Sequence, residues 1–126
     1  MIINDPETLR EVEAVFARYE AALLAHDAAA LDAMFLHRDD TVRYGVGENQ
    51  YGIGEIRAFR NAQSPFTRTL QGTTIVTYGK DVATASTLFE RPDCPGKIGR
   101  QMQTWIRVDG GWRVAAAHVS MIDAPV

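Results

Sequence analysis

Four long segments of strand-like sequence fill the second half of the chain, and they restrict its fold more than any other feature. They cover residues 66–78, 82–91, 97–108 and 112–121 and are rich in β-branched and aromatic residues. Glycine, proline and aspartate separate them, as in the Asp-Gly-Gly run at 109–111. Because short turns join neighbouring segments, the sequence predicts an antiparallel meander.

Apolar or small residues occupy both alternating sets of positions in these segments. Val82 and Leu88, for example, alternate with Ala83, Ala85 and Phe89. Successive side chains of a strand face opposite sides, so such a sheet is apolar on both faces and needs two covers. Helices can cover one face, and a second copy of the chain is the simplest cover for the other. We therefore expect a homodimer that pairs through the sheet.

The first third of the chain is predicted to be helical. Asp5 can cap the helix, and Pro6 can occupy its first position, where a missing N–H costs nothing. An apolar row recurs at steps of three and four residues and places one face of this helix in the core, as far as about residue 26. The row consists of Leu9, Val12, Phe16, Tyr19 and Leu23.

A second helix is expected over residues 28–35, capped by Asp27, and a third over 54–61. In the third, Ile56 and Phe59 occupy one side while Arg57 and Arg60 occupy another.

Between these two helices, residues 41–46 have strand character, and residues 47–50 supply a turn, which predicts a hairpin. The order of elements predicts an α+β fold over residues 1–126, a single domain. In this fold a curved antiparallel sheet forms a cone around the N-terminal helices and encloses a pocket.

Composition excludes several classes of protein. The chain has 13 basic and 16 acidic residues, a net charge of -3, so it lacks the positive surface that nucleic acids require. Cys94 is the only cysteine, so no internal disulfide can form. The N-terminus does not resemble a signal peptide, and no stretch approaches the ~18 uninterrupted apolar residues of a membrane span. We expect a soluble cytoplasmic protein.

Arg43 is the first candidate for chemistry. It stands among apolar and aromatic residues of a predicted strand, so it should be half-buried and need an anionic or carbonyl partner. A ligand carboxylate would fit its planar fork. The structural alternative is an ion pair with Asp39, Asp40 or Glu48.

Tyr19 is the one residue of the buried helical row whose side chain has a polar group, the phenolic hydroxyl. A buried phenol usually finds a hydrogen-bond partner, which could be a substrate. Positive charge from Arg43 nearby would make the hydroxyl a better proton donor. The structural alternative is a core tyrosine bonded to the backbone.

His118 and Ser120 share strand parity with Trp112 and Ala116, which suggests a polar pocket wall. A satisfied core histidine is the alternative, and no motif supports a Ser-His nucleophile. Gln103 and Trp105 also share a parity and can line the pocket, with the amide contacting a polar ligand and the indole forming a flat wall. The alternative for Trp105 is a structural position in the core.

Arg68 is a second candidate anion anchor, because a dicarboxylate would require two such groups. The structural alternative is that Arg68 lies at the surface and is solvated. The three histidines are scattered and the lone cysteine lies in a turn, so we expect no metal. The glycine pairs lack the spacing of a phosphate or dinucleotide loop, so we expect no cofactor.

The chain resembles known families at two levels. Residues 105–114, followed by 118–120, resemble the closing hairpin of the SnoaL-like, nuclear-transport-factor-like cone proteins. A narrower resemblance, to the bacterial AtzH-like and HpxZ-like proteins, covers nearly the whole chain. It is carried by residues 16–23, 41–52, 55–60, 77–79, 83–89 and 99–105.

These proteins accompany amidases in cyanuric acid and oxalurate (ureide) breakdown. The resemblance implies a small cofactor-free decarboxylating amidohydrolase that acts on a carboxylated urea such as dicarboxyurea. Tyr19 and Arg43 match positions regarded as essential in the triazine-pathway group, whereas the oxalurate-pathway members have no settled role. The alternative is therefore a non-catalytic accessory or ligand-binding subunit with an amidase partner. An isomerase or dehydratase ranks third.

Overall fold

The computed structural model describes residues 1–125 and has the predicted α+β architecture. Within these residues three helices and six strands follow one another along the chain. They are α1 (Pro6–Leu24), α2 (Ala28–Ala33), β1 (Val42–Tyr44), β2 (Asn49–Tyr51), α3 (Ile53–Ala62), β3 (Thr69–Tyr78), β4 (Val82–Glu90), β5 (Lys97–Val108) and β6 (Gly111–Asp123). Asn49 and Gln50, expected in the turn of the first hairpin, belong to β2.

Helix α1 begins where its sequence predicts. The Asp5 carboxylate accepts hydrogen bonds from the Thr8 backbone N–H at 3.1 Å and from the Thr8 hydroxyl at 2.8 Å, and Pro6 occupies the first turn. The predicted apolar row is buried at its centre and half-buried at Leu9 and Leu23. None of the described helices is long and apolar enough to cross a membrane.

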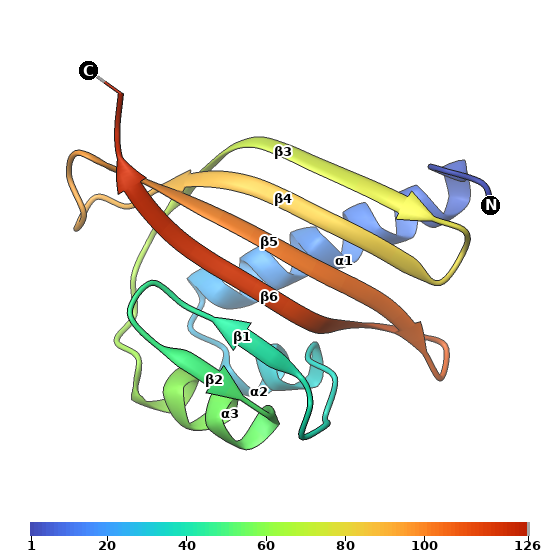
Figure 1. The fold of residues 1–126 in the computed structure, drawn as a ribbon, viewed down its shortest axis with the longest axis horizontal. Helices are drawn as coiled ribbons and strands as arrows, with labels where there is room; N and C mark the ends of the chain where they lie inside the picture. Colours follow the sequence, from blue (N-terminus) through green and yellow to red (C-terminus); the bar gives the residue numbers. More distant parts are fainter. Residues whose placement is uncertain (126) are drawn as a thin grey trace.

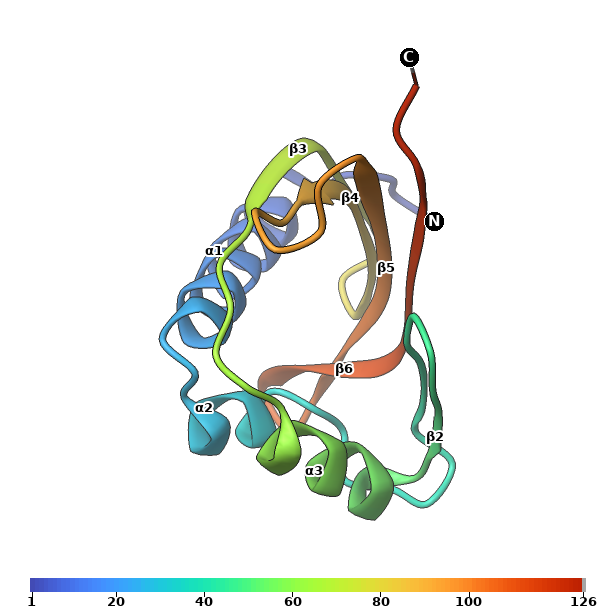
Figure 2. The same ribbon diagram turned by 90° about the vertical axis from the view of Figure 1, so that its left-hand side faces the viewer.

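The six strands form one sheet in the order β2-β1-β6-β5-β4-β3. The pairs from β3 to β6 are antiparallel, as predicted, but β1 lies parallel to β6 and joins the hairpin to the meander. The sheet curves around α1 (Figures 1 and 2), and α2 and α3 lie at one end of the curve. Side chains of the helices and of the concave face line a pocket between them.

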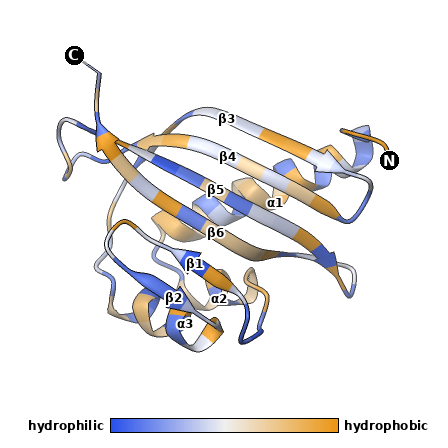
Figure 3. Cartoon of the chain, in the orientation of Figure 1, coloured by the Kyte–Doolittle hydropathy of each residue, from blue (hydrophilic) through white to orange (hydrophobic). Residues whose placement is uncertain are grey.

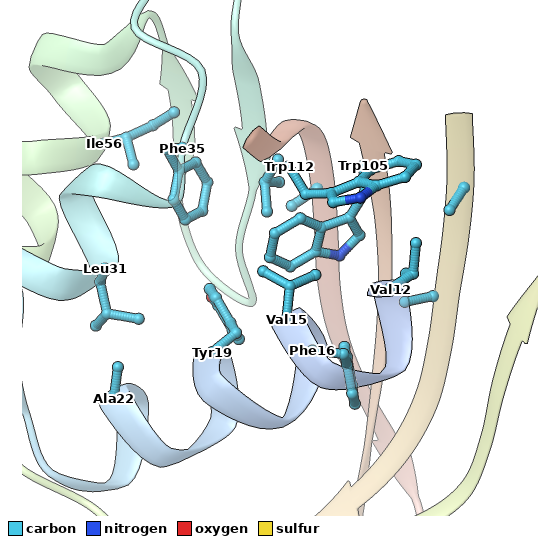
Figure 4. Packing of buried hydrophobic residues seen from close by; sticks show 14 residues of the cluster. Val12, Val15, Phe16, Tyr19, Ala22, Leu31, Phe35, Ile56, Trp105 and Trp112 are labelled. Atoms are coloured by element: carbon cyan, nitrogen blue, oxygen red, sulfur yellow. The ribbon is translucent and has the colours of Figure 1, made fainter. Parts of the chain in front are cut away.

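The hydrophobic core lies between α1 and the concave face of the sheet. Trp105 is fully buried and meets the edge of the Tyr19 ring, with 5.9 Å between ring centroids. Phe35 lies on the other side of Tyr19 at 6.3 Å. Figure 4 shows Tyr19 rising from α1 between these aromatic groups. Burial of each large apolar side chain contributes about 1.5–3 kcal/mol, so this layer dominates the stability of the fold.

A β-bulge interrupts the pairing of β5 with β6. Thr104 pairs with Ala116, but Trp105 pairs with Val114, so Ala115 has no partner. The extra residue reverses the alternation of inward and outward side chains along β6.

This reversal corrects the expected pocket wall on β6. Before the bulge Trp112 points inward, but after it Ala117 is the buried residue and His118 is exposed. His118 and Ser120 therefore belong to the convex outer face, where the aromatic ring of Tyr44 lies 6.1 Å from the His118 ring. The prediction that His118 contacts a ligand in the pocket is not supported by this placement.

The outer face of the sheet carries exposed apolar side chains, as the sequence predicts. Figure 3 shows hydrophilic and hydrophobic positions following one another along the strands. Val82, Leu88, Met102 and Ile122 are each about two-fifths exposed or more. Within residues 1–125 no helix covers this face (Figure 2).

Gly99 provides a test of packing at the concave face. It pairs with Phe89, whose ring lies across it, so that a Cβ at position 99 would be 2.1 Å from Phe89 Cζ. We expect Gly99→Ala to lower the free energy of unfolding by about 1–3 kcal/mol, since the ring must move. Urea denaturation measures the change. Gly47→Ala is the control, because a Cβ there meets nothing within 4 Å; equal stability of both variants would contradict the packing.

Candidate functional site

A pocket of about 200 Å³ opens between the helices and the concave face of the sheet. Helices α1 and α3, the hairpin turn and strands β1, β4, β5 and β6 all contribute to it. Its size suits a small metabolite rather than a nucleotide. The lining side chains that carry chemistry are Tyr19, Arg43, Glu48, Gln63, Arg68, Arg91, Gln101 and Gln103.

Arg43 enters the pocket from β1, on the same side of the sheet as its buried partners Gln50 and Ala117. Its Nη1 donates to Oε1 of Glu48 at 3.2 Å and to Oε1 of Gln50 at 3.1 Å. The ion pair considered for Arg43 therefore forms, with Glu48 as its partner. Within residues 1–125 both hydrogen bonds of the guanidinium come from Nη1, which leaves Nε and Nη2 for a ligand. The Phe59 ring lies under the guanidinium at 5.1 Å.

The tight turn after β1 brings Glu48 to Arg43. The Gly45 N–H donates to the Glu48 carbonyl at 2.8 Å, and the Glu48 carboxylate lies where a Cβ of residue 45 would be. Glycine at position 45 thus allows the carboxylate to approach the backbone beside Arg43.

Tyr19 is buried among aromatic rings and lines the same pocket as Arg43. No side-chain hydrogen bond of its hydroxyl is found within residues 1–125, so the backbone-bonded alternative is not what the structure contains. The hydroxyl can therefore donate to, or accept from, a ligand.

Arg68 is buried, contrary to the alternative of a solvated surface position. Its Nε and Nη2 donate to the Glu20 carboxylate from α1, with the shortest distance 2.6 Å, and its Nη1 donates to Gln101 Oε1 at 3.0 Å. Its side chain is 3% exposed. Arg68 therefore reaches the pocket, but Glu20 already neutralises its charge. Its main structural effect there is to hold Gln101.

Three glutamines in or beside the pocket, Gln50, Gln101 and Gln103, have their amide orientation determined by donors. Gln101 Oε1 accepts from Arg68, Gln50 Oε1 from Arg43, and Gln103 Oε1 from Trp105 Nε1 at 3.0 Å. Each amide NH₂ is then left to donate elsewhere, and the Nε2 atoms of Gln50 and Gln101 are buried without a partner.

Four of the six predicted site residues therefore meet in one pocket: Tyr19, Arg43, Arg68 and Gln103. Trp105 is fully buried in the core behind Gln103 and orients its amide, so the predicted flat wall is not part of the lining. His118 lies on the outer face. Within residues 1–125 no three His, Cys, Asp or Glu side chains are grouped as metal ligands.

Sequence reasoning missed Gln101 and Arg60. Gln101 is two residues from Gln103 on the same strand, so parity alone could have found it. Arg60 follows Ile56 by four residues, and both are buried on one face of α3. The expectation that Arg60 lies with Arg57 on another side of this helix is therefore wrong for Arg60. Burial lowers the pKa of the Arg60 guanidinium below its ordinary value.

Solved structures define the class of fold. A nuclear-transport-factor-2-like protein of unknown function from Pseudomonas putida is 20% identical, with 90% of this chain and 86% of that chain covered and a TM-score of 0.75. At this identity the likeness concerns the fold alone. The chain therefore has the nuclear-transport-factor-2-like, or cystatin-like, α+β fold.

The chain belongs to the AtzH-like family, whose model matches residues 1–125. A protein of unknown function from Pectobacterium atrosepticum is 53% identical, with 96% and 95% of the two chains covered and a TM-score of 0.92. A cystatin-like fold protein from Burkholderia xenovorans is 44% identical, with 99% of each chain covered and a TM-score of 0.96. No curated protein matches the chain.

Breaking the buried ion pair between Arg68 and Glu20 should have a large effect on stability. Glu20→Ala leaves the Arg68 charge buried without its carboxylate, and we expect a loss of about 3–5 kcal/mol in the free energy of unfolding. Glu13→Ala, an exposed position on the same helix, is the control. The double variant Glu20→Ala/Arg68→Met should recover much of the loss. Thermal and urea unfolding measure all three, and a Glu20→Ala variant as stable as the control would contradict the pairing.

Proposed function

We propose that the protein is a small decarboxylating amidohydrolase, working without a cofactor, that acts on a carboxylated urea such as dicarboxyurea. The observation that carries the proposal is the convergence of Tyr19 and Arg43 in one small pocket, each with donors that the protein leaves unused. Membership of the AtzH-like family supports the same reaction. Such a reaction belongs to the nitrogen catabolism of triazines or ureides.

In this mechanism Arg43 binds a carboxylate of the substrate through Nε and Nη2, while Glu48 and Gln50 hold Nη1. As the bond between the carboxylate carbon and nitrogen breaks, its electron pair passes to nitrogen. Nitrogen takes the phenolic proton of Tyr19, carbon dioxide leaves, and the phenolate recovers a proton from water. The step needs a proton donor and stabilised charge rather than a strong nucleophile.

Removal of either group should therefore slow the reaction. A charge-assisted contact made in the transition state is worth on the order of 3 kcal/mol, so we expect Arg43→Ala and Tyr19→Phe each to lower the rate about a hundredfold or more. The assay follows carbon dioxide release from freshly generated dicarboxyurea, against the spontaneous rate. Arg10→Ala and Tyr51→Phe, at exposed positions, are the matched controls.

Normal turnover by both pocket variants would contradict the mechanism. Absence of release above the spontaneous rate in the wild-type protein would overturn the enzymatic proposal. It would favour the accessory-subunit alternative, for which copurification with a ureide amidase, or a change in that enzyme's activity, is the direct measurement.

We also propose that two copies of the chain pair through the outer face of the sheet. Met102 lies at the centre of this face, opposite Ser86 on β4 and His118 on β6, and is 58% exposed. With Val82, Leu88 and Ile122 it forms apolar surface that no described helix covers. A second copy would bury it by a symmetric contact.

Met102→Glu should convert the dimer to monomer, because two symmetry-related carboxylates would enter an apolar contact. Size-exclusion chromatography with light scattering gives the mass of each species. Arg10→Glu, on the opposite layer, is the control. A wild-type monomer of 13.9 kDa, or a dimer unaffected by Met102→Glu, would contradict pairing through this face.

A further inference from the structure

A recess at the inner end of the pocket contains a group that the proposed mechanism does not use. The recess has a volume of about 40 Å³ and ends at Arg60 of α3. Tyr19, Leu23, Arg43, Phe59 and Gln63 line both the recess and the main pocket, so the two adjoin each other. A ligand bound to Tyr19 and Arg43 therefore lies beside Arg60.

The Arg60 guanidinium is buried without a hydrogen bond to any residue in the described range 1–125. The residue is 8% exposed, and Nη1 in particular has no partner. Its nearest carboxylate oxygen, Asp32 Oδ1, is 3.5 Å away. A guanidinium has five N–H donors, and leaving them unpaired in the interior is costly.

The Asp32 carboxylate does not accept a hydrogen bond from Arg60, because both of its oxygens already accept from Arg57. Arg57 Nε donates to Oδ1 at 2.8 Å and Nη2 to Oδ2 at 3.1 Å, a two-pronged contact from the exposed side of α3. This contact holds the pKa of the Asp32 carboxyl below its ordinary value. Asp32 thus stays charged and attracts Arg60, but its strong hydrogen bonds go to Arg57.

The Phe35 ring holds the Arg60 guanidinium in place, with the guanidinium carbon 5.0 Å from the ring centroid. Arg60 is therefore oriented by stacking while its N–H groups stay unused. Of the described residues that line the recess, Arg43 and Arg60 carry positive charge; Arg43 is paired with Glu48, whereas the carboxylate nearest to Arg60, Asp32, is already bonded to Arg57. The surplus of positive charge favours an anion.

The wall of the pocket formed by β5 also offers donors. The amide oxygens of Gln101 and Gln103 are occupied by Arg68 and Trp105, so their NH₂ groups remain for a ligand. The carboxylate on this lining, Glu48, is already bonded by Arg43 and by the Gly47 N–H at 3.0 Å. A ligand that satisfies both walls needs acceptor groups at both of its ends.

We propose that Arg60 is a ligand-binding residue that, with Arg43, holds one carboxylate of a linear dicarboxylate beside Tyr19, while the amides of Gln101 and Gln103 bind the other end. Arg60 then determines specificity for two-ended anions over monocarboxylates. The inference rests on the proposed function for the identity of the natural substrate, but ligand binding tests it without turnover.

Glutarate is the probe, because its five-carbon chain with a carboxylate at each end matches the backbone of dicarboxyurea and cannot react. Butyrate, with one carboxylate, is the comparison. Isothermal titration should show tighter binding of glutarate than of butyrate by the wild-type protein. Arg60→Gln should weaken glutarate binding at least tenfold and reduce the preference, since the neutral amide replaces a charged fork.

Arg60→Lys keeps the charge without the planar fork and should bind glutarate with intermediate affinity. Arg18→Gln, exposed on α1, is the control and should bind as the wild type does. Urea denaturation of each variant shows that it is folded; if Arg60→Gln is not, the comparison of Arg60→Lys with the control decides, and equal affinity overturns the inference.

Failure of this inference can be distinguished from failure of the proposed function. No glutarate binding, no preference over butyrate, or full affinity in folded Arg60→Gln would overturn the role of Arg60 even if dicarboxyurea were turned over. Glutarate binding that depends on Arg60, in a protein that does not accelerate dicarboxyurea breakdown, would support this site and overturn the catalytic proposal alone.

Discussion

The contact between α1 and the concave face of the sheet is the interaction on which the rest of the structure depends. One helical row supplies the apolar layer that packs against Trp105, and the same row carries Tyr19 to the pocket. The fold and the site therefore share a single layer of side chains. A change that loosens this layer alters the position of the Tyr19 hydroxyl as well as the stability of the protein.

Buried charge in this protein is arranged in two different ways. All three guanidinium nitrogens of Arg68 donate hydrogen bonds, Nε and Nη2 to Glu20 and Nη1 to Gln101. Arg68 therefore helps to hold α1 against the sheet. Arg43 is partly engaged and Arg60 has no hydrogen bond within the described residues. Unused donors on buried guanidiniums are costly unless a ligand satisfies them, and this cost distinguishes a binding group from a structural one.

The same principle explains the polarity of the pocket. Arginine and tryptophan donors occupy the amide oxygens of Gln50, Gln101 and Gln103, so these amides, which could otherwise present either end, keep their NH₂ groups free to donate. A wall of donors binds anionic ligands and stabilises negative charge, which suits loss of carbon dioxide from an N-carboxylated urea more than it suits proton abstraction by a base. The proposed chemistry, which the family resemblance implies, is thus compatible with a lining of donors and does not require a nucleophile.

Much of the fold could be predicted locally. The cap at Asp5, the apolar row of α1 and the turns between the four long strands are signals read within a few residues, and each is confirmed. Arg43 and Tyr19 were singled out as candidates from sequence, because a charge in an apolar strand and a phenol in an apolar helical row need a partner, and the family resemblance favoured a functional role for both.

Other features depend on partners distant in the sequence. The bulge at Ala115, which moves His118 to the outer face, is a property of the pairing between β5 and β6. The Arg68–Glu20 ion pair joins residues 48 positions apart, and the isolation of Arg60 arises because Arg57 takes Asp32 from the preceding helix. The sequence by itself determined which segments form helices and strands and which polar residues need a partner. Only the tertiary structure decided which partner each one obtains, because register and competition for a shared carboxylate are set by contacts across the whole fold.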